Sequence, residues 1–265
     1  MVQKALILSA GQGKRLLPLT ELRAKCLLSF SGRTLLEWQI ESLVDNGIRD
    51  ITVVTGFGAE AVETVSQTYA GSGIRVDTLF NPFFEVAENI GSCFIARALM
   101  SADEFVLLNG DTLFHPELFE RAMAQAKGPI TVTVDKKDRY DDDDMKVHCD
   151  GDRLLKIGKH LTAMESEAES IGMLFFSAEG GKMFASAIEK SLRDPRGLKR
   201  WYLSIIDGLA QEHDVRVASI HGMEWCEVDY PRDLAAARNL AERMRREQLL
   251  GKTRSVLPRR SGKAV

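Results

Sequence analysis

Residues 6–20 read LILSAGQGKRLLPLT. The segment begins with apolar side chains, as a buried strand does, and continues into a loop with two glycines and two adjacent cations. Because Gly11 and Gly13 lack a Cβ, the backbone can turn sharply there and bring its N–H groups against an anion. Lys14 and Arg15, with Lys25 further along, carry the positive charge that neutralises phosphate. The stretch therefore predicts a cradle for a triphosphate.

The spacing of this loop does not match two common phosphate-binding motifs. A P-loop has four residues between its first glycine and a Gly-Lys-Ser/Thr sequence, and the step from Gly11 to Lys14 is too short for that. The dinucleotide fingerprint needs a third glycine three positions after the second, where this chain has Leu16. The missing glycine also argues against a nucleotide-dependent oxidoreductase.

The composition predicts a globular domain with a small-molecule ligand. The chain has 265 residues, of which 45% are hydrophobic, so it can bury a full core. We expect a single domain over residues 1–250, followed by a basic, mobile tail over residues 251–265. A formal net charge of −3 argues against a nucleic-acid partner, which calls for a dominant basic field.

The sequence also predicts a cytoplasmic location and no membrane association. Its four cysteines are scattered without a CxxC spacing, and no apolar segment near the amino end resembles a signal peptide. No apolar run approaches the roughly 18 residues that span a bilayer. The sequence leaves a homo-oligomer open.

The first half of the chain alternates strand and helix patterns, whereas the second half is mixed. Unbroken apolar strands in βα order imply a parallel sheet covered on both faces, with ligands at the carboxyl ends of its strands. The predicted strands of the first half are 5–9, 51–55, 74–80 and 105–108, and its helices are 34–46, 59–69 and 92–100. The later strands are 130–135, 145–149, 153–157 and 171–177, and the later helices are 178–192, 198–213 and 231–247.

Two carboxylates stand where such a sheet would present them to a ligand. Asp111 follows an apolar strand within Leu-Leu-Asn-Gly-Asp, and Asp229 lies in Glu-Val-Asp shortly before a predicted helix. Mg²⁺ prefers oxygen ligands and commonly takes one or two carboxylates together with phosphate oxygens. The run Asp141–Asp144 is interpreted instead as a solvated acidic loop.

The opening pattern resembles that of the nucleotidyltransferases that include the nucleotide-sugar pyrophosphorylases. Those enzymes begin with a strand, then Ala-Gly-x-Gly-x-Arg-Leu, Pro-Leu-Thr and Pro-Lys, and this chain departs only at Ala24. The resemblance implies a Rossmann-like α/β fold with a mixed, mostly parallel sheet flanked by helices and a small β-rich insertion on the acceptor side. It also implies Mg²⁺ held by Asp111 and Asp229, and catalytic roles for Arg15 and Lys25. Implied nucleotide-binding residues are Leu8, Ala10, Gly11, Gly13, Lys14, Arg15, Asn89 and Ser92.

Two later segments resemble the cytidylyltransferase branch that makes CDP-choline and related CDP-alcohols or phosphonates. One is Asn-x-x-Ser at residues 89–92, where Ser92 would also serve as a helix N-cap. The other pairs Asp-Asp-Asp-Met-Lys-Val at residues 142–147 with Ile-Gly-Lys at residues 157–159. This resemblance implies that a lysine meets the acceptor's phosphate or phosphonate; Lys146 and Lys159 are both candidates, and Lys159 is favoured. Acids and aromatic faces would hold an ammonium group. The implied acceptor-binding residues are Lys159, Trp201, Tyr202, Glu227 and Tyr230.

The leading hypothesis is a Mg²⁺-dependent cytidylyltransferase. It would join CTP to a phosphocholine-type phosphorylated alcohol or phosphonate and release pyrophosphate. The alternatives are a sugar-1-phosphate or inositol-phosphate nucleotidyltransferase on the same scaffold, or a nucleotide-binding regulatory subunit without catalysis. Such a subunit would be expected to lose a metal carboxylate or a cradle cation, and this chain keeps all of them.

Overall fold

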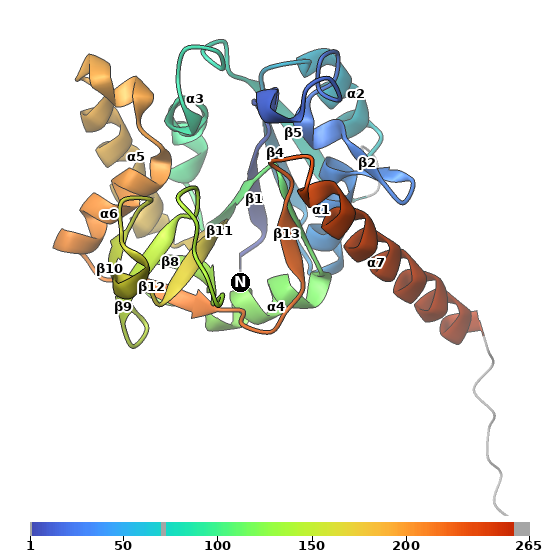
Figure 1. The fold of residues 1–265 in the computed structure, drawn as a ribbon. Coiled ribbons are helices and arrows are strands. Elements are labelled where there is room, and N and C mark those ends of the chain that lie inside the picture. The colour runs from blue at the N-terminus through green and yellow to red at the C-terminus, as the bar shows by residue number, and fades with distance from the viewer. Residues whose placement is uncertain (1, 70–72, 257–265) are drawn as a thin grey trace, which may run out of the picture.

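The computed structural model describes residues 2–69 and 73–256, which form a central sheet with helices on both faces (Figure 1). The order of the nine strands in the sheet is β5-β4-β1-β6-β11-β8-β12-β10-β9. These strands are β1 (Lys4–Leu8), β4 (Asp50–Thr55), β5 (Arg75–Phe80), β6 (Phe105–Asn109), β8 (Ile130–Asp135), β9 (Lys146–Asp150), β10 (Arg153–Ile157), β11 (Ala168–Phe176) and β12 (Val215–Ser219). The α-helices are α1 (Leu35–Asp45), α2 (Ala59–Gln67), α3 (Asn89–Met100), α4 (Pro116–Gln125), α5 (Ala178–Leu192), α6 (Tyr202–Glu212) and α7 (Asp233–Val256).

Strand β1 lies between two parallel neighbours and is buried on both faces. It pairs in parallel with β4 and with β6, and β4 pairs in parallel with β5. Leu6 packs on the side of α3, α5 and α6, whereas Ile7 packs with α1 and α4. The carboxyl ends of these parallel strands therefore meet at one edge of the sheet. The loop that carries Gly11 and Gly13, called the glycine loop below, begins at this edge.

The second half of the sheet is mostly antiparallel. Strand β11 runs antiparallel between β6 and β8, and the β9–β10 hairpin extends the sheet at its far end. This hairpin is the small β-rich insertion that the sequence predicted. The predicted α/β fold with a mixed sheet is confirmed, and its parallel character is concentrated in the first half.

The start of α3 corrects one predicted helix. The helix begins at Asn89 with Glu88 as its N-cap residue, so Ser92 lies inside the first turn and is no cap. The Ser92 side chain is buried and accepts a hydrogen bond from Asn81 Nδ2 at 3.1 Å. Ser92 thus ties α3 to the loop after β5.

Two later helices also differ from the prediction. The segment expected as one helix over 198–213 is divided into a 3-10 helix, η4 (Pro195–Lys199), and α6, because Arg200 and Trp201 have extended backbone between them. Helix α7 runs through Val256, past the position where the mobile tail was expected to begin. The rest of that tail, residues 257–265, lies outside the described residues.

Several elements were not predicted at all. These are helix α4, strand β12 and the short strands β2 (Ser29–Phe30), β3 (Arg33–Thr34), β7 (Thr112–Phe114) and β13 (Trp225–Glu227). The two- and three-residue strands are too short to show a periodic pattern. Helix α4 did carry a signal, because Pro116 stands at its first turn and the His115 side chain caps it.

A third apolar cluster joins the two ends of the described chain. Leu16 of the glycine loop packs with Leu35 and Trp38 of α1 and with Leu240 and Met244 of α7. Figure 1 shows α7, in red, beginning beside α1. No helix within the described residues is both long and apolar enough to cross a membrane.

Candidate active site

The glycine loop leaves β1 and closes through contacts of its own. Gly13 has a φ of 77°, in the left-handed region, and leads into the 3-10 helix η1 (Lys14–Leu16). Thr20 Oγ1 donates a hydrogen bond to the Gly13 carbonyl at 2.8 Å, and Gln12 Nε2 donates to the Thr20 carbonyl at 3.2 Å. Leu16, at the end of η1, is fully buried, and its packing in the core anchors the loop.

Lys25 joins the two predicted metal carboxylates. Its Nζ lies 2.7 Å from Asp111 Oδ2 and also pairs with Asp229 Oδ1. Burial disfavours the charged ammonium, but the carboxylates of Asp111 and Asp229 outweigh burial and raise the pKa of Lys25. Residues that are far apart in the sequence thus converge on one ammonium group.

The backbone explains why the two carboxylates meet. Strand β7, just after Asp111, pairs with β13, just before Asp229, and Val228 N donates to the Asp111 carbonyl at 3.1 Å. At the start of α7, Asp233 Oδ2 accepts hydrogen bonds from the N–H groups of Asp229 and Tyr230 at 2.9 and 2.7 Å. The helix start therefore orients Asp229 toward Lys25.

The Asp111–Asp229 pair fits a divalent cation. Asp111 Oδ1 is buried and has no hydrogen-bond partner among the described residues, so it has the capacity to take a ligand. Within residues 2–69 and 73–256, no group of three or more His, Cys, Asp and Glu residues is arranged to hold a metal. Two carboxylates nevertheless suffice for Mg²⁺, because phosphate oxygens and water commonly complete its shell.

Each of the two carboxylates lines a cavity: Asp111 lines the first and Asp229 the second. The first, of about 180 Å³, is lined by Leu8, Ser9, Gly11, Gly13, Lys25, Cys26, Asn89, Asn109, Gly110 and Asp111. The second, of about 430 Å³, is lined by eight acidic residues, Asp135, Asp141, Asp143, Asp144, Glu169, Glu227, Asp229 and Asp233, and by three basic ones, Lys136, Lys137 and Arg232. Aromatic side chains of Trp225 and Tyr230 complete the second lining with Cys226 and Ala236.

Half of the eight predicted nucleotide-binding residues line the first cavity. Leu8, Gly11, Gly13 and Asn89 line it, whereas Ala10 is buried beside it, with its carbonyl accepting from Phe57 N at 3.0 Å. Asn89 already accepts a hydrogen bond from Tyr202 N at 2.9 Å through its Oδ1. The remaining residues of the set are Lys14 and Arg15, which are exposed on the loop, and Ser92, which is buried in α3.

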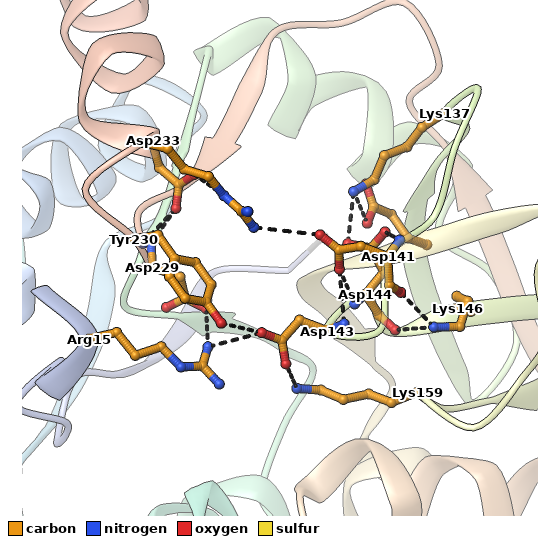
Figure 2. A network of polar contacts seen from close by, with 12 residues as sticks. Arg15, Lys137, Asp141, Asp143, Asp144, Lys146, Lys159, Asp229, Tyr230 and Asp233 are labelled. Carbon is orange, nitrogen blue, oxygen red and sulfur yellow. Dashed lines mark hydrogen bonds and ion pairs between the residues drawn. The ribbon is translucent and has the colours of Figure 1, made fainter.

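Figure 2 shows a network of acids and cations beside Arg15 that corrects the interpretation of the acidic run. Asp143 pairs with Lys159 at 2.9 Å, and Asp144 pairs with Lys137 at 2.8 Å. Asp142 is exposed, as a solvated loop requires, but Asp141, Asp143 and Asp144 line the second cavity and belong to the site. The contacts of Asp143 were not visible in the sequence, because Tyr230 and Lys159 come from distant segments.

Three of the predicted acceptor-binding residues lie close together, and Tyr202 lies apart from them. Lys159 and Tyr230 meet at Asp143, and the Trp201 ring lies beneath Lys159 Nζ, 3.9 Å from the ring centroid. Tyr202 is the exception: its side chain is fully buried, and its hydroxyl donates to Asn109 Oδ1 at 3.1 Å. The prediction that Tyr202 offers an aromatic face to an acceptor is therefore wrong.

Glu227 and Lys146 are placed differently from Lys159. Glu227 lines the second cavity, and burial, with the nearby charges of Asp111 and Asp229, raises its pKa well above its usual range. Lys146, the less favoured acceptor lysine, is buried, and its Nζ donates to the Asp141 carbonyl at 2.7 Å. Lys146 therefore anchors the acidic run, whereas Lys159, the favoured of the two, pairs with Asp143.

Glu169 on β11 makes the stability of the protein depend on pH. It is 4% exposed, and its Oε2 lies 2.7 Å from Lys137 Nζ. Burial raises the pKa of Glu169 to about 7. Because the folded state binds this proton more tightly than the unfolded chain does, stability is lost as the pH rises from the unfolded pKa to about 7.

The variant Glu169→Gln should remove this loss while keeping an oxygen that accepts from Lys137. Between pH 5 and pH 8, we expect the free energy of unfolding of the unmodified protein to fall by about 2–3 kcal/mol more than that of the variant. Urea denaturation at the two pH values measures the difference. Parallel pH profiles for the two proteins would contradict the assignment.

Comparison with known proteins shows the family of the chain. Residues 4–144, more than half of the chain, match the family model described as nucleotidyl transferase. The chain is 30% identical to CMP-5'-(3-aminopropyl)phosphonate synthase of Streptomyces rubellomurinus over 87% of its own length, but spans only 37% of that protein. It is 23% identical to CTP:phosphoglutamine cytidylyltransferase of Campylobacter jejuni over 87% of its own length and 97% of that protein.

Solved structures with related folds agree as well. The inositol-1-phosphate CTP transferase of T. maritima matches with a TM-score of 0.78 and 21% identity, over 92% of this chain and 96% of the other. The CTP:phosphocholine cytidylyltransferase of Streptococcus pneumoniae matches with a TM-score of 0.73 and 23% identity, over 91% and 99%. These likenesses show the fold. With the family match, they identify the chain as a member of the nucleotidyl transferase family that has cytidylyltransferases among its relatives.

Proposed function

We propose that the protein transfers a cytidylyl group from CTP to a small acceptor that carries a phosphate or phosphonate at one end and an ammonium at the other. This class includes phosphocholine-type phosphorylated alcohols and aminoalkylphosphonates. The released product is pyrophosphate. By their names, the proteins compared above make CMP-5'-(3-aminopropyl)phosphonate or transfer a cytidylyl group to phosphoglutamine, phosphocholine or inositol 1-phosphate.

The observation that carries the proposal is the charge pattern across the site. Lys159, Arg15 and the Tyr230 hydroxyl surround the place where Asp143 lies, so this part of the site is suited to an anion. The cavity beyond it is lined by eight acids and three bases. Glu169 and Glu227 have raised pKa values, but the other six acids still outnumber the bases, which favours a cation. An acceptor with both charges matches this order of groups.

The reaction requires positioning and charge stabilisation rather than a protein nucleophile. An oxygen of the acceptor's phosphate or phosphonate attacks the α-phosphorus of CTP, and the bond from that phosphorus to the oxygen of the β-phosphate breaks. Lys25 would contact phosphate near the reaction centre, and pyrophosphate would leave against the backbone of the glycine loop at Gly11 and Gly13. Mg²⁺ held by Asp111 and Asp229 would supply charge neutralisation between the two polyanions.

Pyrophosphate release with Mg²⁺ tests the proposal directly. CTP, UTP, GTP and ATP are each offered phosphocholine, aminoethylphosphonate, inositol phosphate and glucose 1-phosphate. We expect release with CTP and with an ammonium-bearing acceptor. Release only with glucose 1-phosphate or inositol phosphate would make the protein a sugar- or inositol-phosphate nucleotidyltransferase, and no release with any pair would favour a regulatory subunit.

The proposed contact of Lys159 gives a separate expectation. Replacing Lys159 by Ala should raise the acceptor's KM by about tenfold, because a charge-assisted contact to the acceptor is lost, and should leave the KM for CTP nearly unchanged. Lys199→Ala is the control, because the ammonium of Lys199 binds the Val86 carbonyl instead. Equal increases in both KM values in Lys159→Ala would remove Lys159 from the acceptor site.

A further inference from the structure

Asp143 is held by more donors than an exposed loop acid normally has (Figure 2). Its Oδ1 accepts a hydrogen bond from Lys159 Nζ at 2.9 Å, and its Oδ2 accepts one from the Tyr230 hydroxyl. Arg15 Nη1 lies 3.5 Å from the same Oδ2. One carboxylate thus receives two cations and a hydroxyl, which come from three distant segments of the chain.

The three donors are arranged around the carboxylate by contacts that do not involve it. The Arg15 guanidinium lies over the Tyr230 ring, 4.9 Å from the centroid, and also approaches Asp229 Oδ2 at 3.4 Å. The ammonium of Lys159 lies over the Trp201 ring. These contacts would keep the donors in place without Asp143. The donor set is therefore a preformed anion site, and Asp143 is the anion now in it.

We propose that Asp143 occupies the binding site of the acceptor's phosphate or phosphonate group, and that this group displaces the Asp143 carboxylate when the acceptor binds. The proposal rests on the function proposed above. A phosphonate offers three oxygens where the carboxylate offers two, so Arg15, Lys159 and Tyr230 can all be satisfied by the incoming group. Asp143 is thus an internal competitor of the substrate.

The loop can release this side chain without losing its own structure. Asp141 Oδ1 accepts hydrogen bonds from the N–H groups of Asp143 and Asp144, at 2.9 and 3.1 Å. Asp144 pairs with Lys137, and Lys146 donates to the Asp141 carbonyl. The anchors of the loop are therefore residues other than the Asp143 carboxylate, and this side chain is already 40% exposed.

Displacement must happen against the full charge of Asp143. The Tyr230 hydroxyl and Lys159 lower the pKa of Asp143 to about 2, so the carboxylate remains ionised at neutral pH. An incoming anion must therefore compete with the ionised Asp143 carboxylate, because this group does not take up a proton at neutral pH. Removing the charge should strengthen the binding of an anion at this place.

Isothermal titration calorimetry with methylphosphonate tests the proposal. This probe carries the anionic group alone, without an ammonium, and needs no nucleotide and no turnover. We expect Asp143→Asn to bind methylphosphonate about five- to tenfold more tightly than the unmodified protein, because two charged contacts no longer oppose binding. Lys159→Met or Tyr230→Phe, added to Asp143→Asn, should reverse most of this gain.

The matched control is Asp142→Asn, which removes the same charge from the same run. Within the described part of the chain, the Asp142 side chain pairs with none of the three donors. Binding by Asp143→Asn that is no tighter than that by Asp142→Asn would overturn the proposal, as would a gain that survives Lys159→Met. Thermal melts check that each variant is folded, and Asp143→Ser replaces the first variant if it is not.

The calorimetric result is independent of the proposed reaction. If the protein releases no pyrophosphate with any pair of substrates, the binding of methylphosphonate still reports whether Asp143 occupies an anion site. If pyrophosphate is released but Asp143→Asn shows no gain, the function stands and the displacement by the acceptor is refuted. The two failures are therefore distinguishable.

Discussion

Asp111→Asn should lower turnover by about a hundred- to a thousandfold, because the amide keeps the shape of the side chain but removes the charge that would hold Mg²⁺. Asp229→Asn should act in the same way. The melting temperature of each variant should change by only a few degrees, since Lys25 retains one carboxylate partner. Turnover is followed by pyrophosphate release, and Mn²⁺ binding in the presence of CTP gives a second, non-kinetic readout.

The control for this pair is Asp152→Asn. Asp152 also has two cationic partners, Lys127 and Arg216, but it lies outside the linings of the two cavities described above. The Asp152→Asn variant should keep turnover and Mn²⁺ binding close to those of the unmodified protein. If Asp111→Asn kept normal turnover and Mn²⁺ affinity, Asp111 would have no place in the metal site.

Gly13→Ala should lower kcat/KM by about a hundredfold, because small displacements of a positioned group have effects of this size. A Cβ at Gly13 would lie 2.8 Å from Lys25 Cδ, and the φ of 77° disfavours any side chain there. The substitution should therefore displace Lys25 and also destabilise the fold by about 1–2 kcal/mol. Steady-state kinetics and urea denaturation measure the two effects.

Gly11→Ala is the matched comparison within the same loop. A Cβ at Gly11 would meet no protein atom within 4 Å, so the free energy of unfolding should hardly change. Gly11 does line the first cavity, so the added methyl group should raise the KM for CTP. The assignment of Gly13 would be contradicted if the two variants lost stability and activity to the same extent.

The parts of the site predicted from sequence are those that local patterns specify. The glycine loop follows a strand that is apolar on both faces, and Asp111 follows another, so the parallel sheet brings both to one edge. The motif resemblance added Asp229, which the structure brings to the same lysine as Asp111. Spacing and strand order were sufficient for the loop and Asp111, whereas Asp229 depended on the resemblance.

The rest of the site depends on tertiary contacts that have no local signal. Both Tyr202 and Tyr230 are tyrosines that the sequence alone cannot tell apart. Packing against Phe184 buries the Tyr202 ring, whereas the Tyr230 ring lies beside Arg15. Asp143 and its neighbour Asp142 differ only in which side chains the folded chain brings near them. The order of acids within the run Asp141–Asp144 could not show which of them meets Lys159.

The apolar cluster beneath the glycine loop has a consequence for the order in which the site forms during synthesis. Leu16 leaves the ribosome well before Leu240 and Met244, which pack with it. Asp229 also emerges long after Lys25, so the ammonium of Lys25 gains its second carboxylate only later in translation. A nascent chain therefore carries the glycine loop without its support until helix α7 has been made.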